Sequence, residues 1–175
     1  MMHDFDFQPT LEGARVIVRP IAPSDWDQMF AAAADPQIWE QHPASDRYQE
    51  AVFREFFADA IASGSAFAFV DRHGGKIFGS SRYHGHDPER REVEIGWTFL
   101  SRDYWGGSYN AEIKQLMLEH AFLFVDTVVF WVGETNFRSR RAVEKIGGVL
   151  RDGSHCRIES GDKRSVIYEI RKHPR

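Results

Sequence analysis

A strand-like run, a glycine turn and a helix follow one another in the middle of the chain, and this order restricts the possible folds most strongly. Residues 93–100 are rich in β-branched and apolar side chains, which is typical of a strand. Gly106 and Gly107 come next, and apolar residues then recur with helical spacing over residues 109–124. The start of a helix offers free backbone N–H groups, and glycine lets a ligand approach them closely. The stretch therefore suits a phosphate group, although a Gly-Gly pair before a helix is more often only a tight turn.

Hydrophobic periodicity predicts the other elements as well. Strands are expected at residues 15–19, 65–71, 76–83, 127–132, 149–158 and 163–171. Helices are expected at about residues 24–34, 47–63 and 136–146, and irregular connections at residues 37–46 and 84–90. The strand–helix–strand unit of residues 93–132 should form a right-handed parallel crossover, while neighbouring strands form hairpins. We therefore expect one domain, residues 1–175, of the α/β (α+β) class: a mixed central sheet with helices on both faces and the order β-α-α-β-β-β-α-β-α-β-β.

Charge and composition exclude several classes of function. The formal net charge of −4 argues against a nucleic-acid-binding protein that relies on a basic surface. The single cysteine, Cys156, rules out an intramolecular disulfide, fits a reducing compartment and is expected in a strand core. No apolar run reaches membrane-spanning length, and residues 1–6 are unlike a signal peptide. We therefore expect a cytoplasmic protein that binds neither nucleic acid nor membrane.

Three stretches of the chain carry a family resemblance: residues 11–20, residues 94–109 and residues 136–148. Together they resemble the GNAT superfamily of acyl-CoA-dependent N-acetyltransferases, and within it the group that includes ribosomal-protein N-terminal acetyltransferases. The resemblance covers nearly the whole chain, and the order and spacing of the stretches make the joint match fairly specific. It implies a GNAT-like fold, acetyl-CoA as co-substrate, and a primary amine of a small molecule or a protein N-terminus as acceptor.

The resemblance also implies how the glycine stretch would bind coenzyme A. In such enzymes the loop before the central helix binds the pyrophosphate through backbone amides, and the preceding strand binds the pantetheine arm. The coenzyme-binding residues implied here are Phe99, Leu100, Trp105, Gly106, Gly107, Ser108, Tyr109 and Asn110. The family usually has small residues at the two helix-start positions that Ser108 and Asn110 occupy in this chain. Backbone amides do not depend on side-chain identity, so phosphate binding tolerates the change, while the Asn110 side chain could crowd the site or add a hydrogen bond.

The helix near residue 136 carries the second family signature. Asn136 resembles the asparagine that lies beside the coenzyme arm, and it is equally suited to be a helix N-cap. Ser139 matches a position where some members place a serine near the sulfur leaving group, which makes it a catalytic candidate. Many members have a tyrosine as general acid later in this helix, where this chain has Val143. Arg141 is expected to meet a coenzyme phosphate, although arginines on an exposed helix face are more often only solvated.

Two glutamates of the central strand are candidates for the acceptor side of the site. Acetyl transfer to an amine needs a base for the ammonium proton and hydrogen-bond donors at the thioester oxygen. Backbone groups of residues 98–100 could supply the donors. Glu94 is the preferred base, because relatives often have a carboxylate there, and Glu92 lies two residues earlier on the same face. Glu94 could instead be a strand-surface residue paired with Arg90 or Arg91.

The connection between the first two helices should contribute to acceptor binding. It contains Trp39 and His42, although Trp39 could be a packing anchor and His42 simply solvated. The sequence His-Gly-His-Asp at residues 84–87 offers metal-ligand chemistry but has no second ligand cluster, so we predict no metal site.

Two alternatives to the acetyltransferase hypothesis stay open. The missing tyrosine and the changed glycine loop would also suit a non-catalytic acyl-CoA-binding sensor of the same fold. An enzyme that uses a different acyl-CoA is the other alternative. The sequence is compatible with either a monomer or a homodimer.

Overall fold

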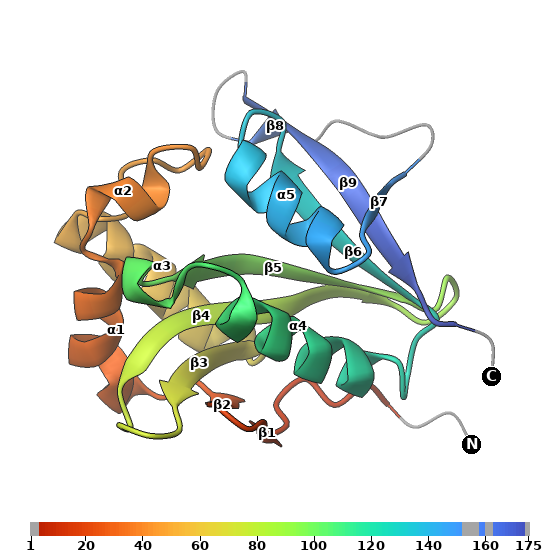
Figure 1. Cartoon of the computed structure of the whole chain (residues 1–175), viewed down its shortest axis with the longest axis horizontal. Coiled ribbons are helices and arrows are strands. Elements are labelled where there is room, and N and C mark those ends of the chain that lie inside the picture. Colours follow the sequence, from red (N-terminus) through yellow and green to blue (C-terminus); the bar gives the residue numbers. More distant parts are fainter. Residues whose placement is uncertain (1–3, 152–157, 160–162, 174–175) are drawn as a thin grey trace.

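The computed structural model describes residues 4–151, 158–159 and 163–173. Its main feature is a mixed sheet with the strand order β1-β2-β3-β4-β5-β6-β9-β7, and β8 pairs with β9 beside this path (Figure 1). The strands are β1 (Leu11–Glu12), β2 (Val16–Pro20), β3 (Ala66–Asp71), β4 (Ile77–Asp87), β5 (Glu92–Leu100), β6 (Thr127–Gly133), β7 (Val149–Leu150), β8 (Ile158–Glu159) and β9 (Lys163–Arg171). All pairings are antiparallel except that between β5 and β6.

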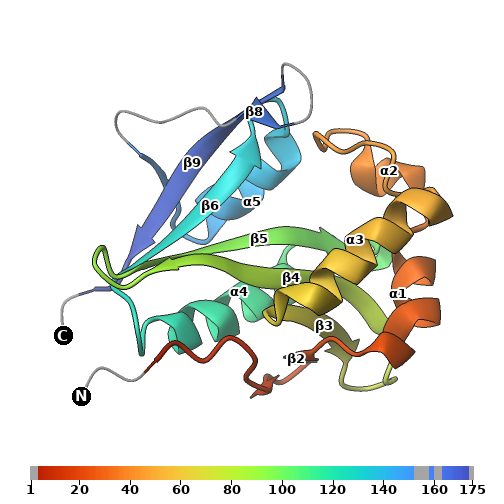
Figure 2. The same cartoon turned by 180° about the vertical axis from the view of Figure 1, so that it is seen from behind.

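Helices cover both faces of this sheet. Figure 1 shows α4 and α5 on one face, and Figure 2 shows α3 crossing the other, with α1 and α2 beside it. The α-helices are α1 (Trp26–Ala33), α2 (Pro36–Trp39), α3 (Glu50–Ser63), α4 (Ser108–Ala121) and α5 (Phe137–Lys145). Two 3₁₀ turns, η1 (Pro23–Asp25) and η2 (Arg102–Tyr104), precede α1 and α4. The predicted mixed sheet with helices on both faces is therefore confirmed.

The alternation of side chains along each strand produces two hydrophobic cores, one on each face of the sheet. On β4, Tyr83 points toward α4 and donates a hydrogen bond to the carbonyl of Met117 at 2.6 Å. On β5, Phe99 points the other way and packs with Trp39 and Phe53 in the core beneath α1–α3. Burial on both faces explains why the residues of β3 read as one continuous apolar run.

The two central strands separate after a short parallel contact. β5 and β6 pair at three positions, Glu92 with Thr127, Val93 with Val128 and Glu94 with Val129. Beyond these positions β5 pairs with β4, and β6 pairs with β9. Residues 95–100 and 130–133 therefore face each other across diverging edges, and we call this region the splay (Figure 2). Within the described part of the chain, the backbone N–H and C=O groups along these two edges have no strand partner.

The structure differs from the expected elements at residues 84–87 and at residues 36–39. Residues 84–87 were expected in an irregular connection, but β4 continues to Asp87 because Gly85 takes a positive φ of 60° and the pairing shifts there. Residues 36–39 form α2, which the Asp35 side chain caps by accepting from the Gln37 N–H at 3.0 Å. The strand predicted at residues 149–158 is described only as β7 and the start of β8, and Cys156 lies outside the described residues.

Candidate functional site

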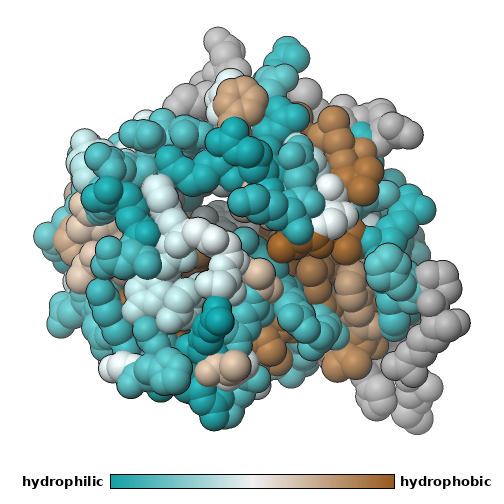
Figure 3. Space-filling model, in the orientation of Figure 1, coloured by the Kyte–Doolittle hydropathy of each residue, from teal (hydrophilic) through white to brown (hydrophobic). Residues whose placement is uncertain are grey.

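The N-terminus of α4 presents backbone donors without side-chain caps. Gly106 and Gly107 have φ values of 112° and 108°, a region that favours glycine. The first intrahelical bond runs from the Ala111 N–H to the Gly107 carbonyl at 2.8 Å, and no side chain caps the helix. Among the described residues, the N–H groups of residues 108–110 therefore have no acceptor, and the positive end of the helix dipole lies beside them. In Figure 3 the surface is hollowed between this loop and α5.

Aromatic contacts fix the loop that leads into α4. The Tyr104 ring stacks on Phe78 with centroids 4.0 Å apart, and its hydroxyl donates to Asp71 at 2.8 Å. The Trp105 indole N–H donates to the Leu100 carbonyl at 3.0 Å. These contacts hold the glycine turn against the end of β5. The sequence-predicted residues 105–110 and the last residues of β5 are thus brought together at one edge of the splay.

β5 contains a bulge immediately before this loop. The register with β4 shifts between Ser80 and Arg82, and Trp97 takes a positive φ of 52°, which is rare for a residue other than glycine. The Ser81 hydroxyl donates to the Gly96 carbonyl at 3.0 Å and lies 2.8 Å from the Thr98 hydroxyl oxygen. Such conformations persist only where the surrounding structure fixes them, and they concentrate at functional sites.

A buried lysine supports the bulge from the α4 face. Lys114 is 4% exposed, and its ammonium group donates to Thr98 Oγ1 at 2.8 Å. Burial lowers the pKa of Lys114 to about 7, so the group can gain or lose a proton near neutral pH. The sequence analysis missed this residue. The sequence did indicate that this lysine could be buried, because it lies between Ile113 and Met117 on the apolar side of the predicted helix.

Glu94 lies on the opposite face of β5, at the start of the splay. It is the last residue of β5 that pairs with β6, and it is 5% exposed. A methyl group on Gly96 would lie 3.1 Å from Glu94 Oε1, so the carboxylate extends along the strand toward the Trp97 bulge. His84 is its cross-strand neighbour on β4, and the His84 ring lies 5.0 Å from that of Trp97.

Glu92 lies at the paired end of β5 and β6 and belongs to an ion-pair cluster. Its carboxylate accepts from the Arg151 guanidinium at 2.5 Å, and Arg151 also donates to Glu169 at 2.9 Å. The bond to Glu92 is the main cause of the raised pKa of Arg151. This arrangement gives Glu92 a structural role, and its contact with the acceptor stays a prediction.

α5 begins on the other edge of the splay. Asn136 is 6% exposed, and its side-chain oxygen accepts from the Ser139 N–H at 3.3 Å, so it is the helix N-cap. Arg141 is exposed, and no hydrogen bond or ion pair joins it to the described residues. Arg138 instead spans the opening: its guanidinium lies 4.1 Å from the Trp105 ring and 3.7 Å from Glu40.

The two predicted acceptor-binding residues of the helix connection differ in burial. Trp39 is 1% exposed, and its indole N–H donates to the Ala33 carbonyl at 2.8 Å, so it is a packing anchor of the core. His42 is half-buried, and its Nδ1 accepts from the Ala44 N–H at 2.9 Å. Their direct contact with an acceptor stays a prediction.

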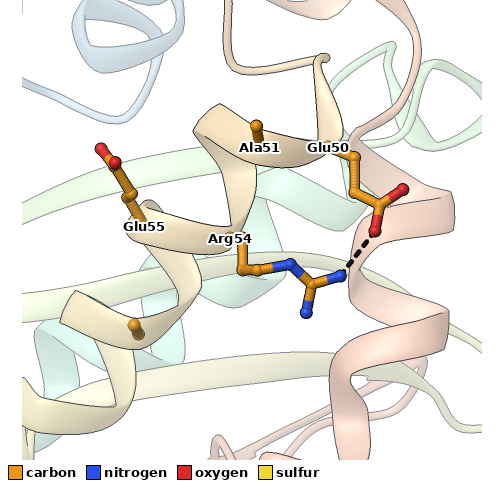
Figure 4. Close-up of a pocket in the computed structure, with 5 residues that line it drawn as sticks. Glu50, Ala51, Arg54 and Glu55 are labelled. Carbon is orange, nitrogen blue, oxygen red and sulfur yellow. Dashed lines mark hydrogen bonds and ion pairs between the residues drawn. The ribbon is translucent and has the colours of Figure 1, made fainter.

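Other features of the described residues do not combine into a second site. A shallow hollow on the outer side of α3 is lined by Glu50, Ala51, Arg54, Glu55 and Ala58, where Glu50 and Arg54 pair with each other at 2.5 Å (Figure 4). No group of three potential metal ligands occurs in the part of the chain that is described. Nor does any described helix have the length and apolarity needed to cross a membrane.

Comparison with known proteins identifies the family. Residues 15–149 match the family model of the acetyltransferase (GNAT) domain. The chain belongs to the GNAT acetyltransferase family. A GCN5-related N-acetyltransferase from Brucella melitensis superposes with a TM-score of 0.85 at 20% identity, over 96% of this chain and 80% of that one. A GNAT-family acetyltransferase from Bacillus anthracis gives 0.77 at 20% identity, over 93% and 98% of the two chains.

A third GNAT structure contains bound molecules. Spermidine N-acetyltransferase from Vibrio cholerae, in complex with CoA and spermine, has a TM-score of 0.66 and 15% identity, over 91% of this chain and 96% of that one. At this level of identity the likeness shows the fold alone. No curated protein matches the sequence significantly. The predicted GNAT resemblance and the assignment as an N-acetyltransferase are confirmed, while the acceptor is a separate question.

One departure from many GNAT members is explained by packing. Val143, where the sequence comparison expects a tyrosine acid, is 7% exposed and belongs to the core between α5 and the sheet. A methyl group on Gly148 would lie 2.4 Å from Val143 Cγ1, so the end of α5 packs tightly around this side chain. Val143 has no ionisable group, so this position of α5 cannot supply an acid for the leaving group.

Proposed function

We propose that this GNAT enzyme transfers the acetyl group of acetyl-CoA to a primary amine at the splay between β5 and β6. The observation that carries the proposal is the uncapped N-terminus of α4, whose leading loop is held against the last residues of β5, where this strand no longer pairs with β6. Free N–H groups at the positive end of a helix suit a pyrophosphate. The unpaired edge of β5 suits the amide groups of a pantetheine arm. The donor set of this chain therefore fits acetyl-CoA, which supplies an activated acyl thioester when bound.

The residues proposed to hold the coenzyme come from both edges of the splay. Backbone groups of residues 105–110 would bind the pyrophosphate, and those of Phe99 and Leu100 the pantetheine arm. Asn136 and Arg141 would contribute from α5. The side chains of Phe99 and Leu100 are buried in opposite cores, so a contact with the arm would have to use their main-chain groups.

Glu94 is proposed to accept the proton of the acceptor ammonium group. Its carboxylate extends toward the bulge on the α3 face of β5, whereas the α4 N-terminus opens on the other face. Acceptor and coenzyme would then approach the splay from opposite sides. Backbone donors around the bulge would stabilise negative charge at the acyl oxygen. The Ser139 hydroxyl, in the first turn of α5, is the proposed proton donor to the sulfur.

Thiol release tests the proposal. The protein is incubated with acetyl-CoA and a panel of primary amines, and the free thiol is measured. Turnover on at least one amine is expected. Glu94→Gln should lower the rate most at low pH, where the amine most needs help to lose its proton. Glu119→Gln, on the exposed side of α4, is the matched control. If the Glu94 variant keeps the full rate at every pH, Glu94 is not the base.

The lack of a proton-donating side chain at Val143 supports one alternative, a sensor that binds acyl-CoA without turnover. The same experiment distinguishes a sensor from an enzyme, because a sensor would bind acetyl-CoA tightly and release no thiol with any acceptor. Turnover that needs a longer acyl-CoA would identify a different donor. Absence of coenzyme binding would contradict the proposed function altogether.

A further inference from the structure

Arg82 of β4 is a buried cation without a polar partner. The residue is 7% exposed, and within the described part of the chain no hydrogen bond or ion pair reaches its guanidinium. The half-buried Arg19 and Arg151, by contrast, bind carboxylates at 2.8 Å and 2.5 Å. Burial lowers the pKa of Arg82 to about 10, and the group is therefore still charged at neutral pH. A buried charge without a counter-ion is costly, so its presence needs a reason.

The surroundings of Arg82 are aromatic and positively charged. Its guanidinium lies 4.7 Å from the Trp97 ring and 5.5 Å from the Phe56 ring. Arg47 lies 4.7 Å from the same Phe56 ring, so two guanidinium groups share one aromatic side chain. The charge of Arg47 further lowers the pKa of Arg82, and that of Asp59 opposes this effect without reaching ion-pair distance. The charged guanidinium of Arg82 between these rings can attract an oxyanion.

Arg82 lies next to the proposed base. It is paired with Gly96 on β5, two residues after Glu94 and directly before the Trp97 bulge. Residues at i and i+2 share one face of a strand, and neighbouring strands lie about 4.8 Å apart. A ligand that reaches both Arg82 and Glu94 would therefore have its anionic group and its amino group only a few bonds from each other.

We propose that Arg82 binds a carboxylate of the acceptor, so that the acceptor is an amine with a carboxylate a few bonds from its amino group. A free amino acid and the N-terminus of a peptide that begins with an acidic residue both have this chemistry. The inference rests on the proposed function and narrows its acceptor class. A polyamine, which carries only positive charge, is a poor match for Arg82 and Arg47.

Matched acceptors test this without any mutation. Initial rates of thiol release are compared for L-amino acids and their C-terminal amides, for the dipeptides Asp-Ala and Asn-Ala, and for spermidine. We expect kcat/KM to be at least about tenfold higher for the carboxylate-bearing member of one pair, since a charged hydrogen bond contributes about 1.5–3 kcal/mol. A preference within the pair of amino acid and amide would indicate a free amino acid as acceptor. A preference for Asp-Ala over Asn-Ala would indicate an acidic peptide N-terminus. Equal rates within both pairs, or a preference for spermidine, would overturn the proposal.

The variant Arg82→Gln tests the residue itself. It should raise KM for the carboxylate acceptor at least about tenfold, and leave KM for acetyl-CoA and for the amide acceptor unchanged. Arg54→Gln is the matched control, because Arg54 also stacks on an aromatic ring, Trp26 at 4.2 Å, but pairs with Glu50. Equal effects of Arg82→Gln on the carboxylate and the amide acceptor would contradict the assignment.

Two further measurements distinguish misfolding of the variant from loss of carboxylate binding. Circular dichroism and thermal unfolding establish that the variant folds, and Arg82→Lys, which keeps the charge, should recover part of the carboxylate preference. If the unmodified protein neither binds acetyl-CoA nor releases thiol, the proposed function fails and this inference fails with it. If it acetylates amines without regard to a carboxylate, only the role of Arg82 is overturned.

Discussion

Two cations, Lys114 and Arg82, lie inside the molecule on opposite faces of the β5 bulge. Lys114 donates to Thr98 from the α4 side, and Arg82 lies over Trp97 on the α3 side. Lysine and arginine are rarely buried without a carboxylate, because loss of hydration penalises the charged form. Their placement at one irregular point of the sheet is an independent sign that this point is functional.

Lys114 should make the stability of the protein depend on pH. Its pKa is about 7 in the folded state, against 10.5 for an exposed lysine. Between these values the unfolded chain binds a proton that the folded chain lacks, so the free energy of unfolding should rise with pH from about 7 to about 10.5, by a few kcal/mol. Below pH 7 the folded state carries the buried charge, and the penalty is complete.

Urea unfolding at a series of pH values measures this effect. In Lys114→Met the rise between pH 7 and pH 10 should be largely lost, whereas Lys145→Met, an exposed residue at the end of α5, should keep it. Parallel stability profiles for the unmodified protein and Lys114→Met would show that the lysine is not buried in neutral form.

At the scale of elements, the start of α4 depends on its backbone conformation more than on its side chains. Gly107 is the N-cap with a φ of 108°, and a methyl group there would meet no atom within 4 Å. The positive φ therefore favours glycine at this position, whereas there is room for a larger side chain. Since the proposed donors at this position are backbone groups, Ser108 and Asn110 are compatible with phosphate binding.

Gly107→Ala should weaken coenzyme binding. Strain of roughly 1–3 kcal/mol at the positive φ is relieved only if the turn rotates, which moves the N–H groups of residues 108–110. Isothermal titration should give a CoA affinity reduced about tenfold or more, the equivalent of about 1.4 kcal/mol. Gly85→Ala is the control, because Gly85 also has a positive φ of 60° and open space but lies on β4 near Asp87. Equal loss of CoA affinity in both variants would contradict the assignment.

Sequence periodicity predicted the elements that are buried on a regular face, and it failed where local backbone conformation decides. The apolar runs of β3, β5 and β6 and the apolar stripe of α3 are clear in the sequence. Residues 84–87 looked like a connection, because glycine and histidine do not reveal that a bulged strand continues. The short helix α2 begins at Pro36, and a proline is compatible both with the first turn of a helix and with the end of the preceding one.

Across the whole molecule, the splay divides the sheet into two arms, and the strands that join them, β5 and β6, pair at three positions. One arm carries β1–β5 with α1–α4, and the other carries β6–β9 with α5. Arg138 makes two of the contacts across the opening, because its guanidinium reaches the Trp105 ring and Glu40. A ligand that touches both edges would therefore connect the arms where the sheet does not.

Coenzyme A should stabilise both arms together. At about 100 times its Kd, a ligand that binds only the folded state adds about 2.7 kcal/mol to the free energy of unfolding. For a chain of this size the expected rise in Tm is roughly 5–10 °C. Hydrogen exchange should slow at residues 95–100 and at residues 130–133.

Adenosine 3′,5′-bisphosphate, which lacks the pantetheine arm, is the control ligand. It should slow exchange at the start of α4 and leave residues 130–133 unchanged. Protection by coenzyme A that is limited to one arm would contradict binding in the splay.

The candidate site could be predicted from the sequence only where a local motif carries it. The glycine turn, Asn136 and Glu94 follow from short patterns, and all three lie at the splay. Lys114 and Arg82 belong to no motif, and their importance comes from burial and from neighbours distant in the sequence. Glu92 had the same face and spacing as Glu94, but its partner Arg151 lies 59 residues away and could not be foreseen.

The partnerless guanidinium of Arg82 has a consequence for selectivity. Folding has already removed most of the water around the Arg82 guanidinium, so the binding of a carboxylate would require little further dehydration of this group. A neutral amide would gain little from the charge of Arg82. If Arg82 binds the acceptor carboxylate as proposed, its preorganised charge would lower the free energy of unfolding of the ligand-free protein and increase its discrimination between acceptors. The protein would then have lower thermal stability and higher acceptor selectivity. A variant selected only for heat tolerance would be expected to have Arg82 replaced.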